Sequence, residues 1–543
     1  MSNQAVTQQD QMVRGTLWLT VGNFASRLMG ALYVIPWLIW MGEHSHQANA
    51  LFSMGYTIYA IFLNMSTAGI NVAVAKQIAK YNSMGKPAMS FKLIRVALTF
   101  MMGLGLFFGA LMYLGAPLFA KMSGVEVELV PVMRSLSWAV LIFPAMSIVR
   151  GIFQGLNTMK PYAMSQVAEQ LIRLIWMLLT TFFIMQVGSG DYVKAVTQST
   201  FAAFVGMLAS VAVLVYYLWQ ADLIKPILET PASSEPIDSR AVLLETVKEA
   251  IPFIVTGAAI QIFQLIDQFT FINTMSLLTD WTQAELEVLF SYFSANPNKI
   301  FMILISVATA IGGVGIPLLT ENVVKGEREA SAKLILNSLT MLLVFLLPAV
   351  AGTILLAKPL YTTFYGIPDN MALTLFILAM LTTLVLGIYT VLAPMLQALF
   401  ENRNAVKYFL YGALVKLVLQ LPLIVVFHAY GPILATAVGL AVPVVLMAKR
   451  MRQITGFDHT LLFNRGLLIV LQTLVMALLV LVVEILLNSL LPVTGRLSSM
   501  IHLAVGGAVG VGLYAVMSLA TRSIDFIIGK PKADHLRARF KIK

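Results

Sequence analysis

The chain has 543 residues, of which 59% are hydrophobic and only 11% are charged, and its formal net charge is +11. With a mean hydropathy of +0.85 it carries more apolar surface than a water-soluble globule can bury, so a soluble protein is excluded. It contains no cysteine, which excludes disulfides and thiol chemistry.

Apolar runs of about 20 residues recur along the chain, and each is long enough to cross a bilayer as a helix. We predict an all-α integral membrane protein with 14 transmembrane helices. In chain order the predicted spans are 16–40, 51–74, 93–119, 131–153, 163–186, 195–219, 249–275, 290–318, 334–357, 370–398, 406–428, 431–447, 466–489 and 498–520. The first twelve residues are polar and lack the basic region of a cleaved signal peptide.

The Lys and Arg residues predict the orientation of these spans. If the N-terminus is cytoplasmic, 27 of the 36 Lys and Arg residues, with Arg150 among them, fall in inner loops and the C-terminal tail, and five fall in outer loops. This bias follows the positive-inside rule, so we expect both termini in the cytoplasm. The net charge then reports membrane topology, and no nucleic-acid partner is expected. The basic tail is expected to lie against anionic lipid, with a solvated flank as the alternative.

The chain resembles itself at an offset of 241 to 243 residues. The matching pairs are SFKLIRVALT (90–99) with SAKLILNSLT (331–340), Pro117 and Gly124 with Pro359 and Gly366, and LIRL (171–174) with LVKL (414–417). Because the first copy contains six spans, an even number, both copies enter the membrane in the same direction.

We therefore predict two parallel six-helix repeats, or lobes, plus two extra C-terminal helices. The expected domains are an N-lobe at 1–222, a cytoplasmic linker at 223–248, a C-lobe at 249–448, spans 13 and 14 at 449–521, and the basic tail at 522–543. Nothing in the sequence demands more than a monomer.

Four cations lie inside predicted spans: Arg27, Arg173, Lys299 and Lys416. A charge at such depth costs about 3 kcal/mol or more, and normally faces protein or a water-filled cavity. Arg173 and Lys416 occupy matching positions of the two repeats, which favours an inward-facing role in substrate binding; snorkelling to the cytoplasmic surface is the alternative. Glu169 lies four residues before Arg173 on the same helix face and is expected to pair with it.

Arg27 lies near the middle of the first span, beside Asn23 and Ser26. Small and polar residues allow neighbouring helices to approach closely. We expect these three residues to face a substrate cavity, and a buried structural pair for Arg27 is the alternative.

The seventh span carries a polar stripe. Gln261, Gln264 and Gln268 share one face of the helix, and Asp267 lies about 60° further round. The glutamines are candidate substrate-binding residues. Lys299 begins the eighth span at a depth similar to that of Asp267, so the two are expected to pair, with a purely structural bridge as the alternative.

Two parallel bundles with a cationic seam suit alternating access to a site between them. Arg and Lys select anionic groups such as phosphate or pyrophosphate. Asp267 and Glu169 are candidate gating or ion-coupling residues, while coupling to Na⁺, H⁺ or the membrane potential stays open and no other cofactor or metal is expected. Glu484, a lone acid near the outer end of span 13, is expected to snorkel and is assigned no role.

Three segments resemble a known family: SRLMGALYVIP (26–36), AGINVAVAKQIAKYNSMGK (68–86) and RGIFQGLNTMKPYAMSQVAEQLIRL (150–174). They are similar to the Gram-positive polysaccharide biosynthesis and lipid II flippase family of YtgP-type, MurJ-type and SpoVB-related proteins, within the multidrug, oligosaccharidyl-lipid and polysaccharide (MOP) exporter superfamily. The resemblance implies a V-shaped pair of six-helix lobes. It also implies a cationic cavity for the pyrophosphate and sugar of an undecaprenyl-linked precursor, and a groove beside spans 13 and 14 for the lipid.

Residue by residue, the resemblance is partial. Ser26 and Arg27 match the family's cavity-associated arginine motif, but the second arginine expected six residues later is Tyr33. The arginine expected in the second span is absent from YAIFLNMSTAGIN (59–71). The cation set of this chain is therefore expected to include Lys299, Arg173 and Lys416 instead.

The favoured function is an alternating-access flippase in the cytoplasmic membrane for an undecaprenyl-pyrophosphate-linked precursor, lipid II or another lipid-linked oligosaccharide. A multidrug cation antiporter of the same superfamily is the first alternative, and the excess of buried cations over acids argues against it. A membrane glycosyltransferase or polymerase is the second. That enzyme needs paired carboxylates or a metal site and a large loop, and because the longest polar stretch, about 220–248, is too short, we expect no enzyme.

Overall fold

The computed structural model describes residues 30, 33–67, 74–75, 77–78, 81–82, 84–156, 158–229, 251–252, 254–525 and 530–540. None of these residues forms a strand, so the predicted all-α class is confirmed for the described part of the chain. Ten described segments are long and apolar enough to cross a membrane, which agrees with a multi-pass membrane protein. Two of the ten, Gln283–Val324 and Asn402–Thr455, each contain two α-helices, and in the second segment these helices meet near His428, which has φ 51°. The exact number of 14 spans stays a prediction, because the predicted first span lies largely outside the described residues.

The chain forms two compact units, Met1–Phe269 (unit 1) and Thr270–Lys543 (unit 2). Unit 1 contains α2 (Val34–Met41), α3 (Ser45–Thr67), α5 (Pro87–Met122), α6 (Leu129–Gly155), α7 (Met159–Phe182), α8 (Tyr192–Gln220) and α9 (Ile224–Glu229). Helix α11 (Ala259–Leu278) begins in unit 1 and ends in unit 2. Unit 2 continues with α12 (Gln283–Phe290), α13 (Asn296–Val324), α14 (Arg328–Leu355), α15 (Ala357–Tyr365), α16 (Asn370–Ala398), α17 (Asn402–Phe427), α18 (Gly431–Thr455), α19 (His459–Leu490), α20 (Arg496–Ala520) and α22 (Lys530–Phe540).

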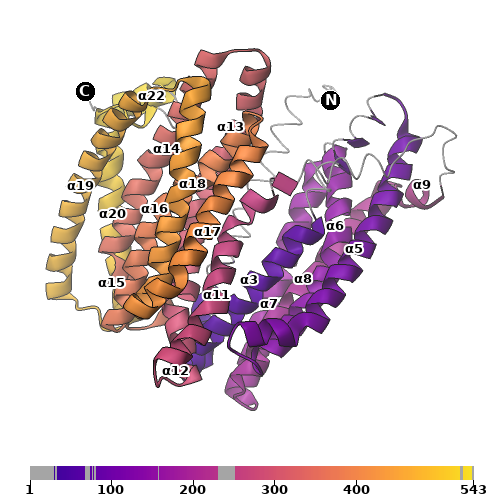
Figure 1. The fold of residues 1–543 in the computed structure, drawn as a ribbon, viewed down its shortest axis with the longest axis horizontal. Helices are drawn as coiled ribbons and strands as arrows, with labels where there is room; N and C mark the ends of the chain where they lie inside the picture. Colours follow the sequence, from indigo (N-terminus) through magenta and orange to yellow (C-terminus); the bar gives the residue numbers. More distant parts are fainter. Residues whose placement is uncertain are drawn as a thin grey trace. The chain divides into compact units, whose positions relative to one another are not determined.

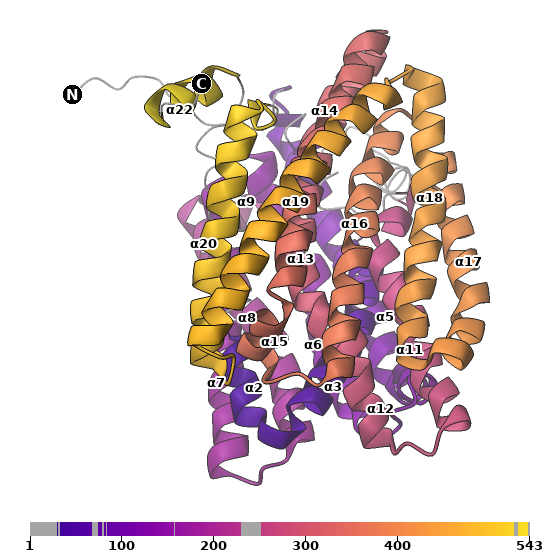
Figure 2. The same ribbon diagram turned by 90° about the vertical axis from the view of Figure 1, so that its left-hand side faces the viewer.

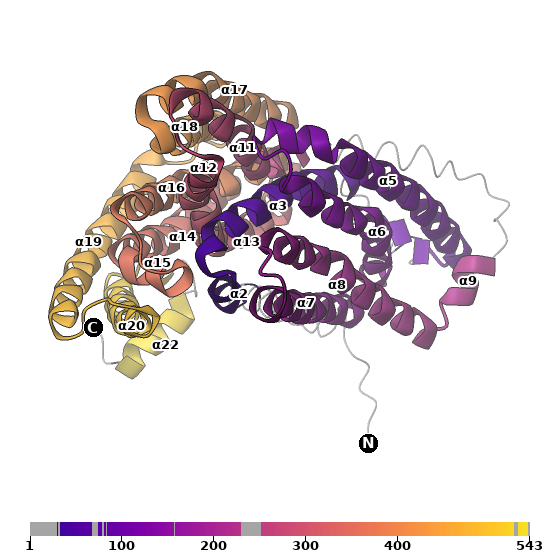
Figure 3. The same cartoon turned by 90° about the horizontal axis from the view of Figure 1, so that it is seen from below.

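Helix α6 is the central helix of unit 1, and α3, α5 and α8 pack around it (Figures 1 and 3). Small residues bring these helices together, as expected where van der Waals packing drives association in lipid. A Cβ atom on Gly105 of α5 would lie only 2.3 Å from the backbone oxygen of Leu141 in α6. This close contact fixes which face of α6 packs against α5.

Helix α16 has the same role in unit 2, where it packs against α13, α14 and α18 (Figure 1). Gly312 of α13 lies against α16, since a Cβ atom there would be 3.2 Å from the backbone oxygen of Thr390. Helices α19 and α20 pair with each other, while α14 packs on α19 and α15 packs on α20 (Figure 2). Helices α19 and α20 lie beyond the predicted repeats. They are attached to the rest of unit 2 through α14 and α15.

Helix ends follow local sequence signals. Asp191, Asp369 and Asp458 each cap the N-terminus of the helix that follows, and Asp369 Oδ1, for example, accepts a hydrogen bond from the Ala372 amide at 2.6 Å. Gly124 and Gly366, which match at offset 242 in the sequence, both have a left-handed backbone, with φ of 74° and 95°. This local similarity agrees with a duplication, although the parallel arrangement of the repeats stays a prediction.

The end of the basic tail forms helix α22, which is anchored to the end of α20. Arg537 is buried and donates from Nε to the Leu519 backbone oxygen at 2.7 Å. The same guanidinium pairs with Asp534 at 2.6 Å and with Asp525. The tail is thus held by protein contacts, and its predicted contact with anionic lipid stays a prediction.

Candidate functional site

The predicted residues of the first span, Asn23, Ser26 and Arg27, lie outside the described residues. Their roles as cavity residues therefore stay predictions. The other predicted site residues are on α7, α11, α13 and α17, and their surroundings follow in chain order.

Glu169 of α7 pairs with Arg150, and the expected ion pair with Arg173 is not formed in the described part of the chain, although the Glu169 carboxylate lies within electrostatic range of the Arg173 guanidinium. Arg150 Nη2 lies 2.6 Å from Glu169 Oε2 and donates a hydrogen bond to it. The assignment of Arg150 to an inner loop was also wrong, because α6 extends to Gly155 and the Arg150 residue is only 7% exposed. A guanidinium buried between helices needs a carboxylate close by, and α7 supplies it.

The remaining contacts of Arg150 join three helices of unit 1. Arg150 Nε donates to Ser165 Oγ of α7 at 3.0 Å, and Nη2 donates to Ser210 Oγ of α8 at 2.9 Å. Its guanidinium also lies over the ring of Tyr162, 5.6 Å from the ring centre. The sequence reasoning missed this cluster. The available signal was that Arg150 is followed by the apolar residues of a continuing helix.

Arg173, one turn after Glu169, contacts aromatic residues instead. It donates a hydrogen bond to the Tyr56 hydroxyl of α3 and lies over the Tyr56 ring, 5.1 Å from its centre. Tyr56 in turn meets Tyr59 edge to face at 5.4 Å. The Tyr33 and Tyr59 hydroxyls are within electrostatic range of the guanidinium. Tyr33, at the position where the family resemblance implies an arginine, therefore belongs to the surroundings of Arg173.

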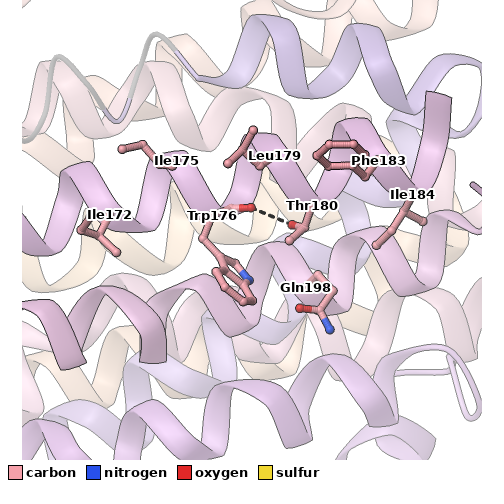
Figure 4. Close-up of a pocket in the computed structure, with 8 residues that line it drawn as sticks. All are labelled: Ile172, Ile175, Trp176, Leu179, Thr180, Phe183, Ile184 and Gln198. Carbon is pink, nitrogen blue, oxygen red and sulfur yellow. Dashed lines mark hydrogen bonds between the residues drawn. The ribbon is translucent and has the colours of Figure 1, made fainter. Parts of the chain in front are cut away.

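An adjacent face of α7 is apolar and exposed. A groove of about 450 Å³ runs along it, and Figure 4 shows the residues that line it. Ile175, Leu179 and Phe183 are 46%, 53% and 59% exposed, as expected for side chains that meet lipid. Helix α7 thus keeps Glu169 and Arg173 on its protein side and presents hydrocarbon outward.

Lys416 of α17 is completely buried, with 0% exposure, so the snorkelling alternative for this residue is wrong. Its ammonium donates to Thr436 Oγ1 of α18. Gly412, the counterpart of Glu169 in the second repeat, permits this approach, because a Cβ atom there would lie 2.3 Å from the Gly439 oxygen. One turn after Lys416, the buried Gln420 donates from Nε2 to Thr270 Oγ1 at 3.0 Å. Gln420 was missed, although its spacing of four from Lys416 places both on one face.

The stripe of α11 is partly buried. Gln268 is fully buried and donates from Nε2 to Ser123 Oγ, at the end of α5, at 2.8 Å. Asp267 is 7% exposed. Gln261 and Gln264 are half-buried, and the Gln261 Oε1 atom is buried without a hydrogen bond in the described part of the chain.

Lys299 is half-buried in the first turn of α13. The start of this helix is fixed by Asn296, which donates from Nδ2 to the Tyr361 hydroxyl at 2.6 Å. The Asn296 backbone oxygen accepts a hydrogen bond from Tyr365 at 2.7 Å. The pairing of Asp267 with Lys299 stays a prediction.

Glu484 of α19 is not a lone acid, contrary to our expectation. Its Oε2 atom lies 2.8 Å from Nδ1 of the fully buried His502 in α20. The sequence reasoning treated each span separately, and the partner comes from the following helix.

A second groove, of about 780 Å³, lies between α14 and α19 in unit 2. Its lining is mostly apolar and includes Leu343, Leu347, Phe463, Leu467 and Val470. Arg465 lies beside this surface on α19, and its Nη1 atom donates to Asn337 Oδ1 of α14 at 3.2 Å. Across the described residues, no cluster of three or more His, Asp or Glu side chains could hold a metal ion.

Comparison with known sequences identifies the relatives of this chain. Residues 12–323 match the model of the polysaccharide biosynthesis protein family. The chain is 31% identical over 533 residues to a Bacillus subtilis (strain 168) protein named lipid II flippase MurJ, covering 96% of this chain and 97% of that one. It is 24% identical over 520 residues to the uncharacterized membrane protein YabM of the same organism, covering 93% and 92% of the two chains.

Solved structures show the same fold. A structure titled lipid II flippase MurJ, inward closed conformation, matches with a TM-score of 0.63 at 14% identity, covering 94% of this chain and 99% of that one. A multidrug resistance MATE family transporter of the MOP superfamily, in an inward-facing conformation, matches with a TM-score of 0.57 at 14% identity, covering 78% and 94%. Both likenesses concern the fold. The family-model match and the full-length sequence match together show that this chain belongs to the polysaccharide biosynthesis protein family of multi-pass membrane flippases and transporters.

Proposed function

We propose that this chain is an alternating-access flippase that moves an undecaprenyl-pyrophosphate-linked cell-wall precursor, lipid II in the first instance, from the inner to the outer leaflet of the cytoplasmic membrane. The observation that carries the proposal is the similarity, along almost the full length of both chains, to the relative named lipid II flippase MurJ. Another lipid-linked oligosaccharide is the nearest alternative substrate.

Cations inside the membrane support an anionic substrate. Arg173 lies among aromatic side chains on the protein side of α7, and Lys299 is half-buried at the start of α13. Together with Arg27 they are the proposed ligands of the pyrophosphate, since Arg and Lys are the usual donors to such groups. Lys416 is fully buried, so a substrate contact there requires α17 and α18 to rearrange.

The groove between α14 and α19 supports a lipid substrate. Its apolar lining suits a polyprenyl chain. Each contact of such a chain contributes little binding free energy, so the chain needs a long continuous apolar surface. Arg465 precedes the lining residue Gly466 on α19, and its guanidinium donates to Asn337 of α14.

Asp267 and Glu169 are the proposed candidates for coupling to Na⁺ or H⁺. Glu169 is neutralised by the Arg150 guanidinium at 2.6 Å, so binding of a coupling cation to this carboxylate is less favourable. The membrane potential alone is the other proposed energy source, because it acts on any charge that moves across the bilayer.

The drug-antiporter alternative is disfavoured by the same residues. The MATE likeness concerns the fold, and folds of this kind carry different substrates. A cavity for cationic drugs needs acids that are not neutralised, whereas Glu169 is paired with Arg150 and Lys416 is a buried cation.

The test is a lipid II translocation assay in cells depleted of their own flippase. Wild type is compared with Arg27→Ala, Lys299→Ala and the control Lys194→Ala at matched expression; Lys194 is exposed and forms only a surface pair with Asp191. Rescue by wild type and the control, with loss in both other variants, is the expected result. Failure of wild type would redirect the proposal to another lipid-linked sugar, and rescue by every variant would leave Arg27 and Lys299 as structural residues.

A further inference from the structure

Glu484 and His502 join the two C-terminal membrane helices inside unit 2. His502 Nδ1 lies 2.8 Å from Glu484 Oε2, and His502 Nε2 lies 2.7 Å from the backbone oxygen of Leu491. Leu491 is the C-cap residue directly after α19. One imidazole therefore contacts both a side chain of α19 and the carbonyl at the end of that helix. The ring has 0% exposure, and the Glu484 side chain is 14% exposed.

These contacts determine how many protons the pair holds. A carbonyl oxygen can only accept a hydrogen bond, so Nε2 must carry a hydrogen. The Nδ1–Oε2 contact then requires one further hydrogen between these atoms, located either on Nδ1 as an imidazolium or on Glu484 as a carboxylic acid. Without it, a nitrogen lone pair would face a carboxylate in a buried site, at a high electrostatic cost.

The shared proton is held by Glu484 and His502 and not by the groups on the neighbouring helices. Glu484 Oε1 is buried and accepts no hydrogen bond from the described residues. Other titratable side chains on α15 and α20 are Lys358, Tyr361, Tyr365, Arg496 and Tyr514. Lys358 is exposed, while Tyr361 and Tyr365 bond with Asn296. On α14 the charged groups are Arg328, Glu329 and Lys333, at the end of the helix remote from Leu356, and on α19 they are His459 and Arg465 in its first turns. On α22, which packs against the far end of α20, Asp534 pairs with Arg537.

The pair is also packed against the rest of unit 2. Gly506 lies one turn after His502, and a Cβ atom there would be 2.9 Å from Glu484 Oε1 and 2.8 Å from Leu356 Cδ2. Leu356 lies between α14 and α15, which pack on α19 and α20. A change in the Glu484–His502 contact would therefore act on the helices that border the α14–α19 groove.

We propose that Glu484 and His502 form a proton-binding site that holds one shared proton and clamps α19 to α20, so that loss of the proton loosens this hairpin. The ligand is H⁺ itself. The site is separate from the cations proposed to bind substrate. It makes the packing of the hairpin depend on whether the Glu484 and His502 side chains hold this proton.

Glu484→Gln is the informative variant. A Gln amide can donate to Nδ1 or accept from it by turning over, so this variant keeps the hydrogen bond without needing the shared proton. Glu484→Ala removes the contact altogether. Both variants keep His502 Nε2 available to Leu491.

The first experiment is NMR of the purified full chain with ¹⁵N-labelled histidine. Between pH 5.5 and 7.5 the His502 ring signals, identified by their loss in His502→Gln, should stay fixed, because the proposed site keeps its proton in the folded protein. Movement of the His502 signals over this range would overturn the proposal.

The second experiment compares thermal unfolding of wild type and Glu484→Gln between pH 6.5 and 8.5. Because the proposed site binds one proton in the folded protein only, the apparent Tm of wild type should fall relative to that of Glu484→Gln as pH rises. Parallel curves would contradict the shared proton. Both experiments need no substrate, so they decide the proton site even if the proposed flippase function fails.

If that function holds, the clamp predicts a further effect on transport. Glu484→Ala, which lacks the contact, should translocate at a different rate from wild type, whereas Glu484→Gln, which keeps the hydrogen bond, should resemble wild type. Equal translocation by wild type and Glu484→Ala would show that the clamp has no influence on the transport cycle.

Discussion

Glu169 accepts a hydrogen bond from Arg150 at 2.6 Å, whereas Arg173, one turn further along the same helix, bonds to Tyr56. Two charged residues spaced for a pair within α7 thus have partners on two other helices. Arg150 comes from α6 and Tyr56 from α3, so the polar side of α7 joins it to both neighbours. The charged residues in this part of the membrane mainly hold helices together. Arg173 extends the polar side of α7 to the aromatic residues of α3.

Removing the carboxylate from the Arg150 cluster should destabilise unit 1. Glu169→Ala leaves a buried guanidinium without its counter-charge, and we expect a loss of about 3–5 kcal/mol in the free energy of unfolding. Replacing both partners by apolar residues, Arg150→Met with Glu169→Leu, should recover most of it. Thermal unfolding of the purified proteins measures both. Lys194→Ala, which breaks an exposed pair, is the control, and equal Tm values for Glu169→Ala and this control would contradict the structural role.

Tyr56→Phe should affect transport without unfolding the protein. The change removes the hydroxyl that accepts from Arg173 and keeps the ring beneath the guanidinium. Loss of one hydrogen bond, worth about 1 kcal/mol, should lower translocation several-fold. Arg173→Ala should lower it further, because the charge itself is lost. The measurement is rescue of flippase-depleted cells, with the exposed Tyr216→Phe as control. Full activity of Arg173→Ala would remove Arg173 from the proposed substrate site.

Lys416→Met separates stability from function at the matching position of the second repeat. Methionine has a similar length and needs no hydrogen bond, so the fully buried site should accept it with a change below about 1.5 kcal/mol. If Lys416 serves the transport cycle, translocation should nevertheless fall at least about tenfold, which corresponds to 1.4 kcal/mol. Unchanged translocation with an unchanged Tm would show that the charge has no role in transport.

Gly412→Ala should separate α17 from α18. A Cβ atom at Gly412 would lie 2.3 Å from the Gly439 oxygen and 2.6 Å from Pro443, and backbone atoms cannot move aside as a flexible side chain can. We expect a loss of about 1–3 kcal/mol. Gly352→Ala is the matched control, since nothing lies within 4 Å of a Cβ atom there. Its Tm should be unchanged or slightly higher, and similar Tm values for the two variants would contradict the close contact.

The pair of Glu401 and Arg450 should make stability depend on pH in the acid range. Arg450 Nη2 donates to Glu401 Oε1 at 2.6 Å, and this hydrogen bond lowers the pKa of the Glu401 carboxyl. Because the folded carboxyl gives up its proton more readily than the unfolded one, the contribution is present above the unfolded pKa of about 4.3 and is lost as pH falls through the folded value.

Tm measured between pH 3 and 6 should therefore fall more gently in Glu401→Gln than in wild type. The exposed Glu329→Gln is the control for the general effect of removing an acid. A decline as steep in Glu401→Gln as in wild type would show that other carboxylates account for the acid sensitivity.

Much of the fold followed from local patterns. Each predicted span that lies within the described residues overlaps a helix, because long apolar runs have few stable alternatives in lipid, and six of them match both ends of the helix to within four residues. The predicted span 334–357 ends in α14 at Leu355, and the separate helix α15, which begins at Ala357, was not foreseen.

Partners of the polar residues were harder to predict. Helical spacing gives the face on which a side chain lies, but not the helix that covers that face. Glu169 and Arg173 share a face and still bond to different helices, and Glu484 meets a histidine 18 residues later in the chain. Arg173 and Lys416 match in the sequence, yet one contacts a tyrosine and the other a threonine.

The sequence by itself determined that this protein is a helical membrane protein and where most of its spans lie, since both follow from the cost of placing polar groups in hydrocarbon. The tertiary structure alone decided which cations are neutralised, which carboxylates are paired, and that Glu484 and His502 share a proton site. Those outcomes depend on contacts between helices distant along the chain, and side-chain hydrogen bonds act only over about 3 Å.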